Sequence, residues 1–212
     1  MKRNKTETTA ENLQNDFYSF YLYIHQDLLG IDDLKTCQWE EELCDFFQYE
    51  VYLKFLRGER PLATSEAPIQ HGKSTKLRLF ACWLIGHHSN LRFNFYTASD
   101  KLRNETQIFI NSVLASKCYR AVFGSVVKSS VSETIWFRKG GQLDFRLMGE
   151  GNTGYASHIS LIDDSYRNSD DTNSLTVREK VETRFRSDIM SRRQHGSMII
   201  VLHNRKFFIF YT

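Results

Sequence analysis

The spacing of hydrophobic residues predicts two helices in the first quarter of the chain. Residues 15–30 are rich in aromatic side chains, and residues 37–57 place apolar residues such as Leu43 and Val51 at helical intervals. Apolar residues three to four positions apart form one face of an amphipathic helix. We interpret the aromatic residues as core. Residues 1 to about 14 are polar and are predicted to lie outside any regular element.

After Pro61 the pattern changes to strands that alternate with helices. Short apolar or alternating runs predict strands, and longer stretches with helical spacing predict helices. Strands are expected at 62–65, 91–95, 135–139, 142–147, 159–162 and 198–202, and helices at 74–85, 100–116 and 174–190. Gly140-Gly141 joins two of these strands as a β-hairpin. This alternation indicates an α/β fold with a largely parallel central sheet flanked by helices.

Composition is ordinary and narrows the function little. The chain has 212 residues, 41% hydrophobic and 25% charged, with a formal net charge of +3. These values fit one sizeable globular domain and demand no nucleic-acid partner, although local basic patches are compatible with them. The longest apolar runs fall short of the ~18 residues of a membrane span, and the basic start continues into polar residues, unlike a secretory signal. The four cysteines form no CxxC pair, which favours a reducing, intracellular compartment without a zinc site or disulfide framework.

One segment matches a phosphate-binding loop. The template is G-x-x-x-x-G-K-[ST], and only its first glycine is replaced, by alanine. The predicted nucleotide-binding residues are Ala67, Pro68, Ile69, Gln70, His71, Gly72, Lys73, Ser74 and Thr75. A bare Gly-Lys-Ser/Thr tripeptide occurs by chance in about one chain in ten of this length. The context therefore matters: a predicted strand precedes the segment and a strongly apolar helix begins at it.

The chemistry of such a loop assigns a role to each of its last residues. Backbone N–H groups at the start of the helix cradle phosphate oxygens, and Gly72 lets the backbone come close. Lys73 reaches the β- and γ-phosphates, and the Ser74 hydroxyl is a metal ligand for Mg²⁺. ATP and Mg²⁺ are therefore the expected cofactors. The alternative is an ordinary helix start, where Gly72 turns the chain and Ser74 caps the helix.

A second acidic site is predicted downstream. Asp163 and Asp164 end a buried hydrophobic strand, about 90 residues after the loop. Phosphoryl transfer needs acidic groups near the metal and the attacking water. On this template Asp163 is a metal residue that holds the Mg²⁺ shell, and Asp164 orients or deprotonates the hydrolytic water. The alternative is a strand-to-helix turn whose acids only cap and face solvent.

Together these motifs resemble the ATPase domain of phage terminase large subunits. The family's modified Walker A motif, A-P-P-[RQ]-H-G-K-S, is similar to residues 67–74, including the histidine before the last glycine. A glycine-rich segment at 149–154 precedes the acidic strand end and a polar run follows it, as in the family's Walker B region. Residues 173–192 resemble the next helix, and 202–205 stand where the family has its coupling motif. The similarity spans about 35 to 205.

This resemblance implies an ASCE (RecA-like) P-loop NTPase fold with an N-terminal helical extension. The catalytic residues it implies are Lys73, Asp164, Arg192 and Arg205, with Arg184 as a further arginine candidate and Asn204 in the coupling motif that senses the γ-phosphate. An arginine at the γ-phosphate stabilises charge that develops during phosphoryl transfer. Solvent exposure or a surface ion pair remains the alternative for each arginine.

The resemblance also implies partners and a location. Terminase large subunits couple ATP hydrolysis to translocation of double-stranded DNA into a procapsid. They act as a homo-oligomeric ring on the portal protein, with a small terminase subunit assisting. The expected location is the cytoplasm of a bacterial host cell, transiently at the portal, without a membrane partner.

The chain departs from the family in several places. Ile69 and Gln70 replace the arginine often found in the loop, and Ser165 stands where the family usually has proline. The sequence divides into a helical extension (1–57), an ATPase domain (58–205) and an atypical Phe-rich tail (206–212) where the family continues into a nuclease domain. We expect no nuclease activity. The alternative function is a truncated prophage remnant that binds ATP without turnover or packaging. A helicase-like motor is a third alternative, but it would need a second RecA-like domain.

Five other residues carry weaker functional interpretations. His71 is expected to shape the loop, with a catalytic base as the alternative. Trp39 or Tyr52 could stack on adenine, although core packing is favoured for both. The pair His87-His88 has no carboxylate at metal-ligand spacing and is interpreted as structural.

Overall fold

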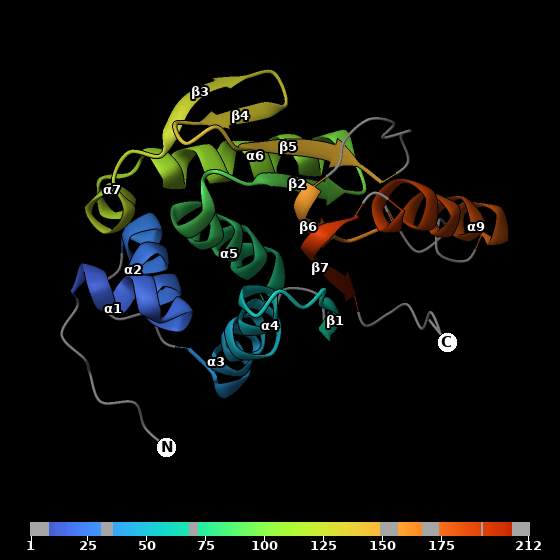
Figure 1. Cartoon of the computed structure of the whole chain (residues 1–212). Coiled ribbons are helices and arrows are strands. Elements are labelled where there is room, and N and C mark those ends of the chain that lie inside the picture. The colour runs from blue at the N-terminus through green and yellow to red at the C-terminus, as the bar shows by residue number, and fades with distance from the viewer. Residues whose placement is uncertain are drawn as a thin grey trace.

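The computed structural model describes residues 9–30, 36–67, 72–148, 157–166, 174–191 and 193–204 (Figure 1). Within them, seven strands form one sheet in the order β1-β7-β6-β2-β5-β4-β3. The strands are β1 (Leu62–Ala67), β2 (Arg92–Thr97), β3 (Val127–Val131), β4 (Thr134–Phe137), β5 (Gln142–Leu147), β6 (Ser157–Asp163) and β7 (Arg193–Asn204). Neighbours from β1 to β5 are parallel, and β4 and β3 continue antiparallel. The largely parallel sheet flanked by helices is confirmed.

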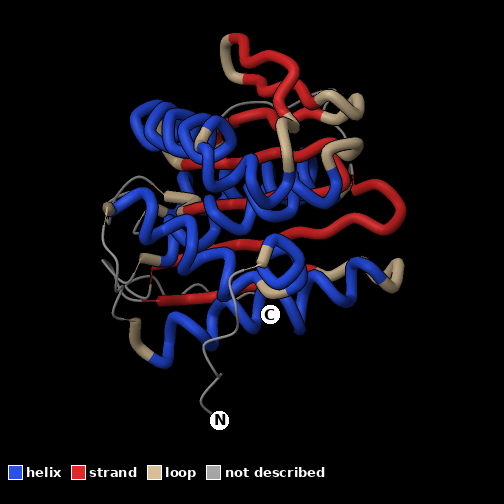
Figure 2. Tube along the Cα trace, turned by 90° about the vertical axis from the view of Figure 1, so that its left-hand side faces the viewer, coloured by secondary structure: helices blue, strands red, loops and turns tan. Residues whose placement is uncertain are grey.

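Helices precede the sheet and connect its strands. They are α1 (Ala10–Asn15), α2 (Phe17–Leu29), α3 (Gln38–Asp45), α4 (Leu53–Leu56), α5 (Lys73–His88), α6 (Asp100–Ala115), α7 (Lys117–Phe123) and α9 (Leu175–Arg184). Two π-helical stretches, η1 (Phe46–Tyr52) and η2 (Phe185–Met190), continue α3 and α9. Figure 2, turned by 90°, shows the strands side by side with the β3–β4 hairpin at the upper end.

The two faces of the sheet are buried by different helices. Alternate strand residues point to opposite faces, and accordingly Leu161 and Ile200 join one hydrophobic cluster while Ile162 and Val201 join another. The larger cluster contains residues of α1, α2, η1 and the nearly all-buried α5, so the N-terminal helices share one core with the sheet. The smaller cluster packs beneath α9 and η2, on the other side of the sheet in Figure 1.

The structure corrects the predicted elements at several points. Residues 10–15 form the helix α1. The Thr9 side chain accepts the N–H of Asn12 at the start of this helix. Leu13 is buried, and its carbonyl accepts the indole N–H of Trp83. The helix α7 and the strand β3 were not predicted. β3 is polar and mostly exposed, so it lacks the hydrophobic alternation that marks a strand. No helix among the described residues is long and apolar enough to cross a membrane.

Candidate phosphate-binding site

The site begins where β1 ends and α5 starts. Gly72 directly precedes α5 with φ +66°, a left-handed conformation that glycine adopts at little cost. Lys73 is the first residue of α5 and is 6% exposed. Thr75 lies in the same first turn and is partly buried. The first N–H groups of a helix have no partner within the helix, so this end of α5 favours an anion.

The structure brings Ser74 and Asp163 together across 89 positions of sequence. The Ser74 hydroxyl donates to Oδ1 of Asp163 at 2.9 Å, and Asp163 is buried at the last position of β6. Nη2 of Arg78, one turn further along α5, lies 3.9 Å from the other carboxylate oxygen. The alternative of a solvent-facing acid is therefore wrong for Asp163.

The environment of Asp163 acts on its pKa in both directions. Burial raises the pKa above its ordinary value, whereas the charge of Arg78, the hydrogen bond of Ser74 and the charge of Lys73 act to lower it. A buried carboxylate is costly in its charged form unless cations lie near it. Three groups on α5 therefore face this one carboxylate, and two of them are cations.

Asp164 adopts an unusual backbone conformation. Its φ is +52°, in the left-handed region, and its N–H donates to the carbonyl of Leu202 at 3.2 Å. Few residues other than glycine occupy this region, although aspartate and asparagine do so more often than most. Strained backbone conformations gather at functional sites. The turn places Asp164 beside β7, directly after the buried Asp163, and its side chain is partly buried.

The strand β7 lies between the loop strand β1 and the acidic strand β6. In register, Leu202 faces Asp163 on β6, and His203 and Asn204 face Glu66 and Ala67 on β1. The predicted coupling residue Asn204 therefore ends the strand between the two halves of the site. The register fixes its backbone alone, and its sensing role stays a prediction.

Sequence reasoning missed His203 and Arg78. His203 is buried, and burial lowers its pKa, opposed by the charge of Glu66 and reinforced by that of Lys73. Arg78 lies five positions after Lys73, beyond the loop template, and only the fold brings it to Asp163. The signal for His203 was its place directly before Asn204 at the end of a predicted strand.

Some predicted site residues lie outside the described part of the chain. They are Pro68, Ile69, Gln70, His71, Arg192 and Arg205. The third arginine candidate, Arg184, pairs with Asp188 one turn along its own helix, at 3.4 Å. Asp188 is buried, so this ion pair lies at the edge of the core and is not the surface pair given as the alternative. The roles predicted for the six residues stay predictions.

The aromatic and histidine candidates make the structural contacts that were favoured for them. Tyr52 packs edge-on against Trp83 at 5.0 Å and hydrogen-bonds His88 at 2.9 Å, which agrees with the core interpretation. His87 lies 3.0 Å from the carbonyl of Gln14 and is likewise structural. The ring of Trp39 packs against the larger hydrophobic cluster, and its centroid lies 5.2 Å from Nζ of Lys76 on α5.

The donor set fits Mg²⁺ held together with phosphate. Among the described residues, His, Cys, Asp and Glu form no cluster of three or more that could hold a metal alone. Magnesium usually takes one or two protein oxygens and completes its octahedron with water and substrate phosphates. The hydroxyl of Ser74 and the carboxylate of Asp163, 2.9 Å apart, are such a pair beside the start of α5.

Comparison with known proteins extends to structure but not to sequence. No protein-family model matches the chain, and no curated protein matches its sequence. Among solved structures, the large terminase of bacteriophage HK97 is similar, with a TM-score of 0.53 and 10% identity over 81% of this chain. The match covers 33% of that terminase, so the chain spans about a third of its length. The chain therefore has a terminase-like fold.

Proposed function

We propose that this chain binds MgATP at the start of α5 and hydrolyses it, as the ATPase domain of a DNA-packaging terminase large subunit. One observation carries the proposal: Ser74 Oγ and Asp163 Oδ1 lie 2.9 Å apart, next to the buried Lys73 at a helix N-terminus. A loop of the form Gly-Lys-Ser and an aspartate at the end of a parallel strand are the two parts that P-loop nucleotide hydrolysis requires.

Each group has a role in this proposal. The N–H groups at the start of α5 and the Lys73 ammonium bind the phosphates, and Ser74 and Asp163 hold Mg²⁺. Mg²⁺ bound by these two residues would neutralise phosphate charge. Asp164 orients the attacking water and accepts its proton. Its left-handed backbone turn, directly after Asp163, positions its carboxylate for this role. Asn204, at the end of β7, belongs to the coupling motif that senses the γ-phosphate.

The arginine roles and the motor function extend the proposal further. Arg192 or Arg205 is proposed to reach a γ-phosphate in a ring of subunits. The ring would act on double-stranded DNA at the portal, with a small terminase subunit, in the host cytoplasm. The terminase-like fold supports this extension.

The direct test measures nucleotide affinity and turnover on the same purified chain. Calorimetric titration with MgATP should give saturable binding that Lys73→Ala weakens about ten- to a hundredfold, the value of a lost charge-assisted contact. Phosphate release should fall with it. The matched control is Asp144→Asn, since Asp144 is buried but bonds Thr134 and Gln142 away from the site. Unchanged binding in Lys73→Ala would refute the site. Binding without any turnover would favour the non-hydrolysing alternative.

A further inference from the structure

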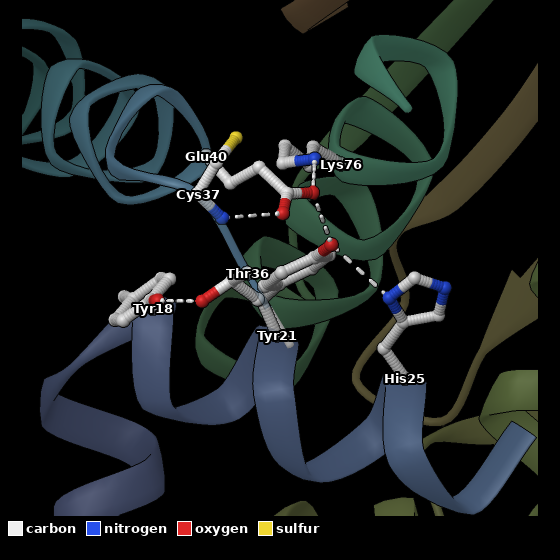
Figure 3. A network of polar contacts seen from close by, with 7 residues as sticks. All are labelled: Tyr18, Tyr21, His25, Thr36, Cys37, Glu40 and Lys76. Atoms are coloured by element: carbon white, nitrogen blue, oxygen red, sulfur yellow. Dashed lines mark hydrogen bonds and ion pairs between the residues drawn. The ribbon is translucent and has the colours of Figure 1, made fainter. Parts of the chain in front are cut away.

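A buried ion pair between Lys76 and Glu40 lies next to Gly72, the residue that precedes α5; Figure 3 shows the pair and its polar neighbours. The Lys76 side chain is 0% exposed, and its Nζ lies 2.6 Å from Oε1 of Glu40 on α3. The same ammonium lies 4.9 Å from the ring centroid of Tyr21 and 5.2 Å from that of Trp39. An ammonium without water is costly, and here a carboxylate and two aromatic faces replace its hydration shell.

Glu40 is held by the N-terminal helices. Its Oε1 accepts the hydroxyl of Tyr21 at 3.0 Å, and its Oε2 accepts the N–H of Cys37 at 3.2 Å. Because the Tyr21 hydroxyl donates to the carboxylate, its oxygen can accept Nδ1–H of His25, 3.1 Å away. Burial acts to raise the pKa of Glu40, but Lys76, Cys37 and Tyr21 lower it below its ordinary value. The carboxylate is therefore ionised and fixed on both oxygens.

This cluster touches the loop at Gly72. A Cβ atom built on Gly72 would lie 3.1 Å from Nζ of Lys76 and 4.0 Å from Oε1 of Glu40. The ammonium thus fills the space behind the residue whose left-handed turn leads into Lys73. Moving Lys76 would remove the support of this turn. No such contact is expected from the loop template, because Lys76 lies one helical turn beyond Gly72 and Glu40 belongs to another helix.

We propose that Lys76 and Glu40 are positioning residues that hold Gly72 and the start of α5 in the geometry that binds phosphate, and that couple α2 and α3 to this end of α5. The inference rests on the proposed nucleotide-binding function. Lys76 influences phosphate binding through its contact with Gly72 and through its fixed charge, one turn inside α5. In this proposal it does not contact the phosphate itself. Coupling is reciprocal, so bound phosphate stabilises the docking of α2 and α3, and displacement of these helices weakens phosphate binding.

A merely structural role for the pair makes a different prediction. Buried ion pairs are often replaced by apolar residues of similar size with little loss of stability. The double variant Lys76→Met/Glu40→Gln removes both charges, keeps the volumes, and leaves no charge unpaired. A structural pair would leave phosphate affinity intact in this variant. A positioning pair would lower it in a protein that still folds.

The experiment measures the Kd of MgATP and of inorganic tripolyphosphate by calorimetry, with ligand-free thermal unfolding recorded for every variant. We expect the double variant and Glu40→Gln to unfold cooperatively and to bind both ligands at least tenfold more weakly than the original chain. Equal affinity in folded variants would overturn the proposal. Weaker ATP binding with unchanged tripolyphosphate binding would also overturn it, because the pair would then act on the base.

Two single-atom deletions provide a second test if the variants of Lys76 and Glu40 fail to fold. Tyr21→Phe removes a hydroxyl that donates to Glu40, whereas Tyr119→Phe removes a buried hydroxyl that donates to the carbonyl of Cys82, far along α5. Both should lower the unfolding temperature, and only Tyr21→Phe should weaken tripolyphosphate binding. Equal effects of the two on affinity would contradict the inference. Absence of nucleotide binding by the original chain would refute the proposed function itself.

Discussion

The hydroxyl of Ser74 on α5 donates a 2.9 Å hydrogen bond to Oδ1 of Asp163 at the end of β6. This contact joins the helix that follows the candidate phosphate loop to the acidic strand two places away from β1 in the sheet. Both side chains offer oxygen atoms, and both lie beside the buried Lys73. In the proposed function, this pair is the magnesium site.

Ser74 and Asp163 should behave as a coupled pair in stability measurements. Ser74→Ala leaves the buried carboxylate with one partner fewer, so we expect a cost of about 1–3 kcal/mol in the free energy of unfolding. Asp163→Asn removes the buried charge, and Ser74→Ala should then cost less. A urea double-mutant cycle should give a coupling energy of roughly 0.5–3 kcal/mol. Strictly additive effects would show that the charge of Asp163 adds nothing to its hydrogen bond with Ser74.

Asp164 should separate nucleotide binding from hydrolysis. Asp164→Asn keeps a residue that tolerates the left-handed backbone but cannot take a proton, so turnover should fall about 10²–10⁴-fold while MgATP affinity changes little. Asp164→Gly should do the same and also relieve the backbone cost, so its free energy of unfolding should not decrease. Steady-state phosphate release and calorimetry measure the two effects. Turnover that survives both substitutions would remove Asp164 from the mechanism.

Gly72 should not tolerate a side chain. An added Cβ would meet the Lys76 ammonium at 3.1 Å, and the left-handed φ of +66° costs about 1–2 kcal/mol for other residues. We expect Gly72→Ala to weaken MgATP binding as well as stability. The comparison is Gly124→Ala, where φ is also positive but no atom lies within 4 Å of the added Cβ. That variant should lose stability alone, as thermal unfolding and calorimetry together would show.

Stability should decrease on mild acidification because of His88. Burial, and then the charge of His87, lowers the pKa of His88 from 6.5 to about 4. The unfolded chain therefore binds a proton more readily than the folded chain, so stability is complete above about pH 6.5 and is lost as pH falls toward 4. His88 is only partly buried and solvent screens its charge, so the loss from this residue at pH 5 is about 1 kcal/mol.

The measurement compares urea unfolding at pH 7.5 and pH 5 in the original chain and in His88→Gln. Glutamine can still bond the Tyr52 hydroxyl but does not titrate, so the variant should show a smaller pH dependence. Burial also lowers the pKa of His87, so His87 destabilises the folded chain at low pH in the same way. It therefore leaves a residual pH dependence of stability in His88→Gln. An unchanged pH dependence in the variant would show that His88 is not the group responsible.

Gly141 tests the hairpin without touching the candidate site. A Cβ at this position would clash with the carbonyl oxygen of Leu91, which belongs to the backbone and not to a flexible side chain. Overpacking of this kind costs about 1–3 kcal/mol, so Gly141→Ala should lower the unfolding midpoint. Its affinity for MgATP should match that of the original chain. An unchanged unfolding midpoint in Gly141→Ala would show that the backbone at Leu91 can move away from this residue.

The sequence by itself determined the local parts of this protein. The spacing of apolar residues and the length of each segment were enough to predict α2, α5, α6 and the buried strands, because these signals arise within each segment. Loop chemistry and a double aspartate at a strand end were enough to indicate Lys73, Ser74 and Asp163. Elements without an apolar signal were missed. The polar strand β3 is defined only by its pairing with β4, and α1 by burial of Leu13 against Trp83.

Tertiary structure alone decided how these parts meet. Parallel strands need long crossovers, so sequence order leaves strand order open, and only the fold placed β7 between β1 and β6. The same holds for Arg78 at Asp163, for His203 near Lys73, and for Glu40 at Lys76, because each pairing depends on packing between elements. Local patterns specify which face of an element is buried, but not which partner covers it. Contacts between distant residues therefore had to come from the folded chain.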